Sequence, residues 1–207
     1  MQENSMNSEV RKNLRYYNDN AQAWANRSTD PFHREKEFLK FIRYFKKGDR
    51  IVDIGCASGI HVPMFLGMGG FLKYEGFDLS GNLISIAKKR YLQLMFYTAD
   101  IMAAKSLPKN KYKGFWASAV LMHIPERDWP IMLRNIAGMC KHGAVGFIIL
   151  PKHRPSPASR KDYRFFTYWD KEKLKKYLDR VNWKILASSR LYSFNQGDWS
   201  WYIVKLP

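Results

Sequence analysis

The chain has 207 residues, of which 35 are Lys or Arg and 18 are Asp or Glu, so its formal net charge is +17. Hydrophobic residues make up 46% and aromatic residues 15% of the sequence, which excludes a disordered chain and supplies one sizeable core. The longest purely apolar run, residues 147–150, is far shorter than the roughly 20 residues of a membrane-spanning helix, and the polar first residues predict no secretory signal.

The first 47 residues predict two helices. Over residues 8–27, apolar side chains recur at three- and four-residue spacing, which is typical of an amphipathic helix. A second helix is expected over residues 31–45, because proline suits its first turn and the Lys-Lys-Gly at 46–48 suits its end.

From residue 50 onward, short β-rich runs alternate with helical segments. Strands are expected at residues 50–54, 72–78, 95–99, 114–121 and 144–150, and helices at 61–66, 82–91 and 129–140. This alternation predicts a parallel α/β sheet with right-handed crossovers. A proline-containing loop at 151–159, a helix at 170–181 and an antiparallel strand pair at 183–192 and 199–205 are expected to follow.

A glycine-containing loop follows the first predicted strand. It comprises residues 53–59, Asp-Ile-Gly-Cys-Ala-Ser-Gly, while Asp78 and Asp100 follow the second and third strands. Ligands bind outside the carboxyl ends of strands in open parallel sheets, and glycine lets a ligand approach the backbone. The acids after successive strands therefore predict a cofactor site. The alternative is that the glycines only form a turn and that Asp78 caps the next helix.

The loop also restricts the type of cofactor. It lacks the Gly-Lys-Ser/Thr of a phosphate loop, and Gly-x-Gly-x-x-Gly fails at Ala57 and Ile60. An acid before the loop suits a cofactor without a pyrophosphate, such as S-adenosylmethionine. Asp78 lies 25 residues after Asp53, where an acid would accept hydrogen bonds from the ribose hydroxyls.

Five segments of the sequence, including the glycine-containing loop, match the motifs of a known protein family. They are residues 52–59, 76–87, 97–101, 116–125 and 164–167, and a Tyr-rich helix at 16–21 precedes them. The sequence resembles the class I S-adenosylmethionine-dependent methyltransferases, small bacterial methyltransferase-11/25 type. Ala57 departs from the family pattern, which has glycine at that position.

The resemblance implies an α/β fold of the Rossmann-like class I methyltransferase type, with a seven-stranded, mostly parallel sheet, helices on both faces and N-terminal lid helices. It implies a single methyltransferase domain over residues 1–207, with a helical lid at 1–47, a cofactor-binding core at 48–150, and a loop, helix and terminal strand pair at 151–207. The implied cofactor is S-adenosyl-L-methionine, and the implied reaction is methyl transfer.

The resemblance also implies site residues. The cofactor-binding residues are Asp53, Gly55, Cys56, Ala57, Gly59, Asp78, Leu79, Asp100, Ile101, Ser118 and Met122. Tyr17 and Trp24 share one helix face and either close over the cofactor or pack in the core. His123 follows the fourth strand and is a candidate general base, with a structural loop histidine as the alternative. The aromatic residues Phe165, Phe166, Tyr168 and Trp169 either floor an acceptor pocket or stack on a base, or they pack in the core or as a lid.

The acceptor and the partners are open questions at this level. Residues 151–190 hold twelve basic and four acidic side chains, which favours an anionic partner such as nucleic acid or is simply a solvated face. A small-molecule acceptor is the first hypothesis, because no RNA-binding module is recognisable. The alternatives are an RNA (tRNA) methyltransferase using the basic 151–190 surface and a non-catalytic S-adenosylmethionine-binding protein. We expect a monomer or homodimer with no membrane partner.

Cysteine usage bears on the compartment and on metals. Cys56 and Cys140 are the only cysteines, and they lie too far apart in the sequence for a metal-ligand cluster. We therefore expect a reduced, cytoplasmic protein without a metal site.

Overall fold

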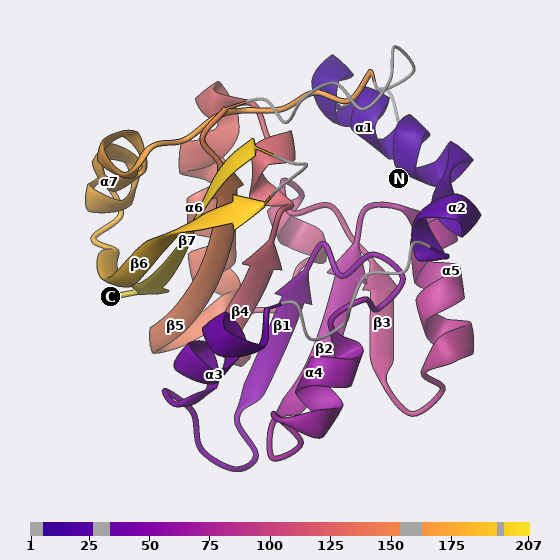
Figure 1. Ribbon diagram of the computed structural model, residues 1–207, viewed down its shortest axis with the longest axis horizontal. Coiled ribbons are helices and arrows are strands. Elements are labelled where there is room, and N and C mark those ends of the chain that lie inside the picture. Colours follow the sequence, from indigo (N-terminus) through magenta and orange to yellow (C-terminus); the bar gives the residue numbers. More distant parts are fainter. Residues whose placement is uncertain (1–5, 27–33, 154–162, 194–196) are drawn as a thin grey trace.

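The computed structural model describes residues 6–26, 34–153, 163–193 and 197–207, and helices cover both faces of a central sheet (Figure 1). Within these residues the sheet has seven strands in the order β3-β2-β1-β4-β5-β7-β6. The parallel strands are β1 (Arg50–Ile54), β2 (Lys73–Asp78), β3 (Met95–Thr98), β4 (Tyr112–Ser118) and β5 (Cys140–Pro151). β7 (Gly197–Lys205) runs antiparallel between β5 and β6 (Lys184–Ser193). The predicted fold is confirmed.

Seven α-helices lie in the described part of the chain. They are α1 (Ser8–Asp19), α2 (Ala21–Ala25), α3 (Glu35–Ile42), α4 (Val62–Gly67), α5 (Gly81–Arg90), α6 (Trp129–Met139) and α7 (Lys171–Asp179). Side-chain caps begin three of them: Asn7 Oδ1 accepts from the Glu9 N–H at α1, Ser80 Oγ accepts from the Leu83 N–H at α5, and Asp170 accepts from the Lys173 N–H at α7.

Some element boundaries differ from the prediction. The single helix expected over 8–27 is broken at Asn20, which follows Asn18 and Asp19, residue types that compete with the helical backbone for hydrogen bonds. The strand expected over 114–121 ends at Ser118, because Ala119 turns the chain with a φ of 57°. The helix expected over 31–45 is observed at Glu35–Ile42, and part of its predicted range, like residues 154–159 of the predicted loop, lies outside the described residues.

Phe115 and Trp116 are neighbours in β4 and pack on opposite faces of the sheet, because successive side chains of a strand point to opposite sides. Trp116 stacks on Phe147 of β5 with ring centroids 3.9 Å apart, and Phe38 of α3 packs against its edge. Phe115 contacts Trp183 on the other face. Both faces are therefore filled by aromatic side chains, which leaves the ends of the strands as the place for a site.

The lid helices α1 and α2 are fixed to α5. Ser80 Oγ donates to Asn18 Oδ1 at 2.6 Å, and Asn82 Nδ2 donates to the Asn18 carbonyl. Arg90 Nη2 donates to the Ala25 carbonyl at 2.9 Å. Figure 1 shows α1 and α2 above the carboxyl ends of the parallel strands. The lid therefore covers the edge of the sheet where the sequence places a cofactor.

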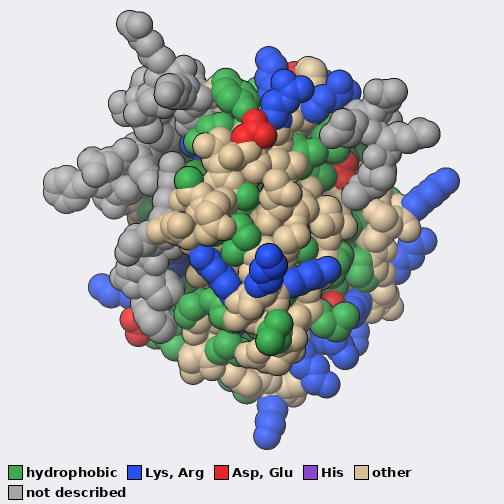
Figure 2. Space-filling model, turned by 90° about the vertical axis from the view of Figure 1, so that its right-hand side faces the viewer, with side chains coloured by type: hydrophobic (Ala, Val, Ile, Leu, Met, Phe, Trp, Pro, Cys, Tyr) green, Lys and Arg blue, Asp and Glu red, His purple; other side chains and the backbone are tan. Residues whose placement is uncertain are grey.

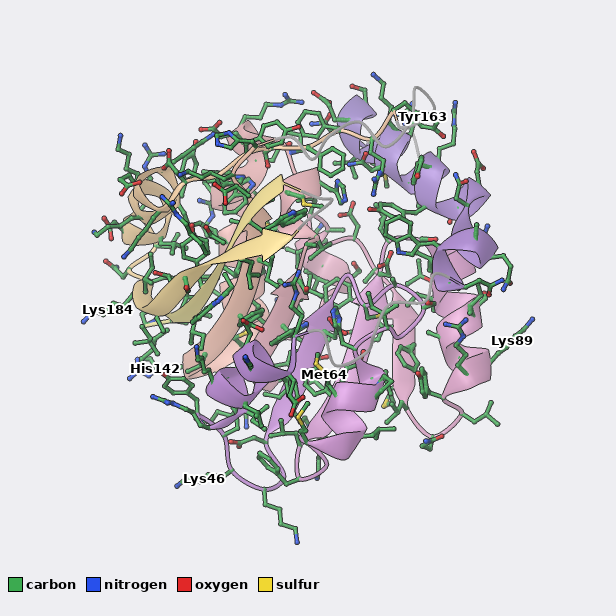
Figure 3. All side chains as sticks on the ribbon, in the orientation of Figure 1. Lys46, Met64, Lys89, His142, Tyr163 and Lys184 are labelled. Atoms are coloured by element: carbon green, nitrogen blue, oxygen red, sulfur yellow. The ribbon has the colours of Figure 1, made fainter. Side chains whose placement is uncertain are left out.

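The residues at 163–169, referred to below as the strap, run from the region of α1 to α7 across the top of the molecule (Figure 1). Tyr163 lies beside α1 (Figure 3), where its ring packs edge-on against Tyr16 at 5.6 Å. At the other end of the strap, Trp169 is fully buried and stacks on Trp129 of α6 with centroids 3.7 Å apart.

No helix in the described ranges is long and apolar enough to cross a lipid bilayer.

Candidate active site

A pocket lies at the carboxyl edge of the sheet, and residues of α1 and α2 line one side of it. Its lining is mainly apolar and includes two carboxylic acids, Asp78 and Asp100. Ten of the fourteen residues predicted for the site line it: Tyr17, Trp24, Gly55, Ala57, Asp78, Leu79, Asp100, Ile101, Ser118 and His123. The fold thus brings together side chains that are more than 100 positions apart in the sequence.

The loop after β1 is shaped by backbone conformation. Gly55 has a φ of 69°, and a Cβ at this position would lie 2.3 Å from Val120 Cγ2, so any side chain here would collide with the opposite wall of the pocket. The N–H groups of Gly55 and Cys56 both donate to the Phe77 carbonyl of β2. The loop is therefore held against β2, and Gly55 lines the pocket with Val120 packed where a side chain would be.

Ala57 occupies the left-handed region with a φ of 50°, where the resemblance places a glycine. A left-handed conformation costs an alanine roughly 1–2 kcal/mol. A glycine avoids this cost but loses more conformational entropy on folding, so the substitution gains only part of the difference. We expect Ala57→Gly to raise the free energy of unfolding by about 0.5–1 kcal/mol, measured by urea denaturation. Ser58→Gly is the matched control in the same loop. A destabilised Ala57→Gly variant would contradict the conformational argument.

Asp78 ends β2 and holds the loop in place. Its Oδ2 accepts from the Ala57 N–H at 3.0 Å, and its Oδ1 accepts from the Ser80 N–H at 2.8 Å. Burial raises the pKa of Asp78 to about 6, although these backbone N–H groups act in the opposite direction. Each carboxylate oxygen retains a lone pair for a ligand. Further hydrogen-bond donors from a ligand would therefore stabilise the ionised carboxylate of Asp78.

The raised pKa of Asp78 predicts pH-dependent ligand binding. A ligand whose hydroxyls donate to Asp78 favours the ionised carboxylate, whereas burial favours the protonated form in the free protein. The affinity for S-adenosylhomocysteine should therefore fall as the pH drops below about 6, approaching tenfold per pH unit. Calorimetry between pH 5 and about 8 measures this dependence. A flat profile would show that Asp78 does not change protonation on binding.

The same pKa shift affects stability with a defined sign. A carboxyl whose pKa is raised on folding contributes stability that is fully present below its ordinary pKa of 3.8 and is lost as the pH rises through about 6. The ligand-free protein therefore carries an unfavourable contribution from Asp78 near neutral pH, which bound hydroxyl donors would relieve.

Four predicted residues lie outside the pocket lining. Asp53 is fully buried and accepts a hydrogen bond from Tyr74 Oη at 2.9 Å. Cys56 is buried, and burial raises the pKa of its thiol. Gly59 packs against Tyr91, and the side chain of Met122 is 4% exposed. These residues support the loops around the pocket, and their contact with a cofactor stays a prediction.

Tyr17, His123 and Arg164 form a chain of hydrogen bonds at the pocket. Tyr17 Oη lies 2.9 Å from His123 Nε2, and Arg164 Nη1 donates to Tyr17 Oη at 3.0 Å. His123 Nδ1 lies 2.9 Å from the Phe165 carbonyl. A carbonyl only accepts, so Nδ1 carries the proton and the neutral imidazole offers the lone pair of Nε2 towards Tyr17 and the pocket. Burial raises the pKa of Tyr17, while Arg164 acts in the opposite direction.

Asn13 and Ser80 also line the pocket, and sequence reasoning missed both of them. Asn13 interrupts the apolar face of α1, and this polar residue at an apolar position was the available signal. The structure separates the aromatic residues of the strap. Phe166 lies beside His123, with ring centroids 4.9 Å apart, whereas Trp169 is buried against Trp129. Of the expected alternatives, Trp169 therefore follows core packing rather than the floor of an acceptor pocket.

The basic residues of the 151–190 segment are partly neutralised. Lys173 pairs with Glu126 at 2.7 Å, and Lys175 pairs with Asp179 at 2.6 Å. Figure 2 shows a different face of the molecule, and Lys and Arg side chains greatly outnumber acidic ones there as well. The positive charge is thus spread over the surface rather than confined to this segment.

Comparisons with known proteins agree with this architecture. Residues 51–143 match the Methyltransf_25 family model, described as a methyltransferase domain. The probable methyltransferase ltbC of Aspergillus luteorubrus is 26% identical over 128 residues, which are 54% of this chain and 43% of that protein. The chain therefore spans less than half the length of this curated relative.

Solved structures share the fold. Magnesium protoporphyrin IX methyltransferase (ChlM) from Synechocystis PCC 6803, with bound S-adenosylmethionine, has a TM-score of 0.76 and 13% identity, over 98% of this chain and 99% of that chain. A Methanosarcina mazei S-adenosylmethionine-dependent methyltransferase has a TM-score of 0.67 and 16% identity, over 79% of this chain and 95% of that chain.

The sheet order, the pocket and the family match point in one direction. Residues 51–143 are similar to a methyltransferase domain, and the described chain shares the fold of solved S-adenosylmethionine-dependent methyltransferases.

Proposed function

We propose that the protein transfers a methyl group from S-adenosylmethionine to a small-molecule acceptor, with His123 as the general base. The observation that carries the proposal is the Tyr17–His123 pair, which lies in the same pocket as Asp78 and Asp100. The lining of this pocket by residues of the lid helices, among them Tyr17 and Trp24, supports a small acceptor. The similarity of the fold to a magnesium protoporphyrin IX methyltransferase is consistent with it.

The residues present fit the cofactor. Asp78 offers acceptor oxygens to vicinal ribose hydroxyls, and Asp100 offers a second acidic group while its Oδ1 accepts from the Met102 N–H. Gly55 and Ala57 line the pocket where the methionine portion would lie, and the rings of Tyr17 and Trp24 line the same pocket from the lid. When bound, the cofactor supplies an activated methyl group on a positively charged sulfur.

The protein's own contribution is alignment, exclusion of water and removal of a proton. The attacking atom of the acceptor would take the methyl group as the sulfur–methyl bond breaks, which leaves neutral S-adenosylhomocysteine. It would give up its proton to His123 Nε2, directly or through Tyr17 Oη, whose own proton then passes to Nε2. The imidazolium is stabilised by the Phe165 carbonyl at Nδ1 and afterwards releases the proton to solvent.

Two measurements test the proposal. Calorimetry with S-adenosylhomocysteine should show binding, and S-adenosylmethionine labelled in its methyl group should label a component of the small-molecule fraction of a cell extract. Absence of binding would overturn the assignment. Label found only in RNA, in a reaction that weakens steeply with salt, would replace the small-molecule acceptor by RNA. Binding without turnover in any fraction would favour the non-catalytic alternative.

A further inference from the structure

Asn13 is a buried polar residue in the middle of α1, and its amide group contacts the strap in both directions. Its side chain is 4% exposed. Asn13 Oδ1 accepts from the Phe165 N–H at 2.7 Å, and Asn13 Nδ2 donates to the Phe165 carbonyl at 3.0 Å. Buried amides with both groups satisfied hold their partners in a defined position, since a displaced partner would leave polar groups unpaired. Asn13 therefore fixes the position of the Phe165 peptide.

The same carbonyl of Phe165 accepts from His123 Nδ1 at 2.9 Å. A carbonyl oxygen has two lone pairs, and here Asn13 Nδ2 and His123 Nδ1 occupy both. The strap is also tied to the loop that carries His123, since the Thr167 N–H and Oγ1 both donate to the Met122 carbonyl, at 2.7 and 3.0 Å. The Phe165 carbonyl, which accepts from His123 Nδ1–H, is thus held on the lid side by Asn13 and on the sheet side by Thr167.

We infer that Asn13 is a positioning residue that holds His123 in the Nδ1–H tautomer through the Phe165 carbonyl, and so keeps the Nε2 lone pair directed at Tyr17 and the pocket. Asn13 and Tyr17 are four positions apart on α1 and share one helix face. One lid helix therefore controls the contacts of both imidazole nitrogens. Tyr17 contacts Nε2 directly, and Asn13 holds the Phe165 carbonyl that contacts Nδ1. This inference rests on the proposed role of His123 as a base.

The experiment uses the full chain labelled with ¹⁵N in its five histidines. Two-bond ¹⁵N–¹H correlation spectra distinguish the tautomers of a neutral imidazole, and the His123 signals are those lost in His123→Gln. The wild type should show the Nδ1–H form alone. Asn13→Leu removes both amide bonds and should yield a mixture with the Nε2–H form. Asn13→Asp, which removes the donor to the Phe165 carbonyl but keeps an acceptor, provides a second test if Asn13→Leu does not fold.

Asn18→Ala is the matched control. Asn18 lies on the same helix, and its Oδ1 accepts from Ser80 Oγ, so Asn18→Ala removes this tie between the lid and α5. The bond from Asn82 to the Asn18 backbone carbonyl remains, and Phe165 is not touched. The His123 tautomer should be unchanged in this variant. If both Asn13 variants keep the wild-type tautomer, or if the wild type shows the Nε2–H form, the inference is overturned.

Kinetics separate this inference from the proposed function. Asn13→Leu should lower the single-turnover rate tenfold or more, while its affinity for S-adenosylhomocysteine falls far less than that of Asp78→Ala. A wild type that neither binds this ligand nor turns over would refute the proposed function, whereas the tautomer spectra would still decide the role of Asn13. A shifted tautomer with an unchanged rate would show that His123 is positioned as inferred but is not the base.

Discussion

Asp78→Ala is expected to abolish measurable binding of S-adenosylhomocysteine. The carboxylate is the acceptor in the pocket to which we assign the ribose hydroxyls, and each hydrogen bond to a charged group contributes about 1.5–3 kcal/mol. Loss of two such bonds corresponds to a decrease in affinity of roughly 10²–10⁴-fold. The variant also loses the acceptor for the Ala57 and Ser80 N–H groups, which hold the loop around the pocket. Isothermal titration calorimetry measures the affinity.

Two further variants separate ligand contact from general damage. Asp78→Asn keeps the volume and one acceptor oxygen, and removes the charge whose burial raises the pKa of this group to about 6. It should fold at least as cooperatively as Asp78→Ala and still bind weakly. Asp49→Ala changes a half-buried acid at the opposite edge of the sheet, which accepts from the Lys46 N–H, and should bind like the wild type. Tight binding by folded Asp78→Ala would remove the basis for the cofactor assignment.

His123→Gln is expected to lower the rate of methyl transfer by roughly 10²–10⁴-fold, the usual contribution of a general base. The amide can still accept from Tyr17 but cannot take up a proton. Affinity for S-adenosylhomocysteine should remain within about threefold of the wild-type value, since the acids at the ends of β2 and β3 are untouched. Single-turnover measurements with the labelled cofactor and the identified acceptor report the chemical step.

Tyr17→Phe provides the comparison for this prediction. It removes the hydroxyl between Arg164 and His123 but retains the ring, which packs against Trp24 with centroids 5.2 Å apart. If Nε2 takes the proton directly, this variant should be slowed far less than His123→Gln. Equal losses would place Tyr17 on the proton path. A fully active His123→Gln would mean that the acceptor needs no base.

The sheet and the pocket were predictable from the sequence because both follow from local patterns. Apolar runs mark the strands, and Asp78 and Asp100 follow them at the carboxyl ends, where parallel strands of one sheet meet. Local patterns are weaker at the ends of elements. Val120 and Leu121 extend the apolar run of β4, yet Ala119 takes a left-handed conformation and ends the strand. No short-range signal distinguishes these two outcomes.

Features that depend on chain segments far apart in the sequence were not predictable. Asn13 and Phe165 are 152 positions apart, and neither has a pattern that points to the other. Similarly, an antiparallel pair was expected at the end of the chain, but nothing in the sequence of β7 indicates that it lies between β5 and β6. The inward or outward orientation of loop residues is equally non-local: Ala57 lines the pocket, whereas the adjacent Cys56 packs in the core.

The indoles of Trp129 and Trp169 lie close enough for their electronic transitions to couple, with centroids 3.7 Å apart and planes inclined by 30°. Such a pair produces an exciton couplet in circular dichroism, and its intensity vanishes once one ring moves away. Because Trp169 terminates the strap that carries Arg164 and Phe165, this optical signal would report whether the strap is seated, in real time and without a label.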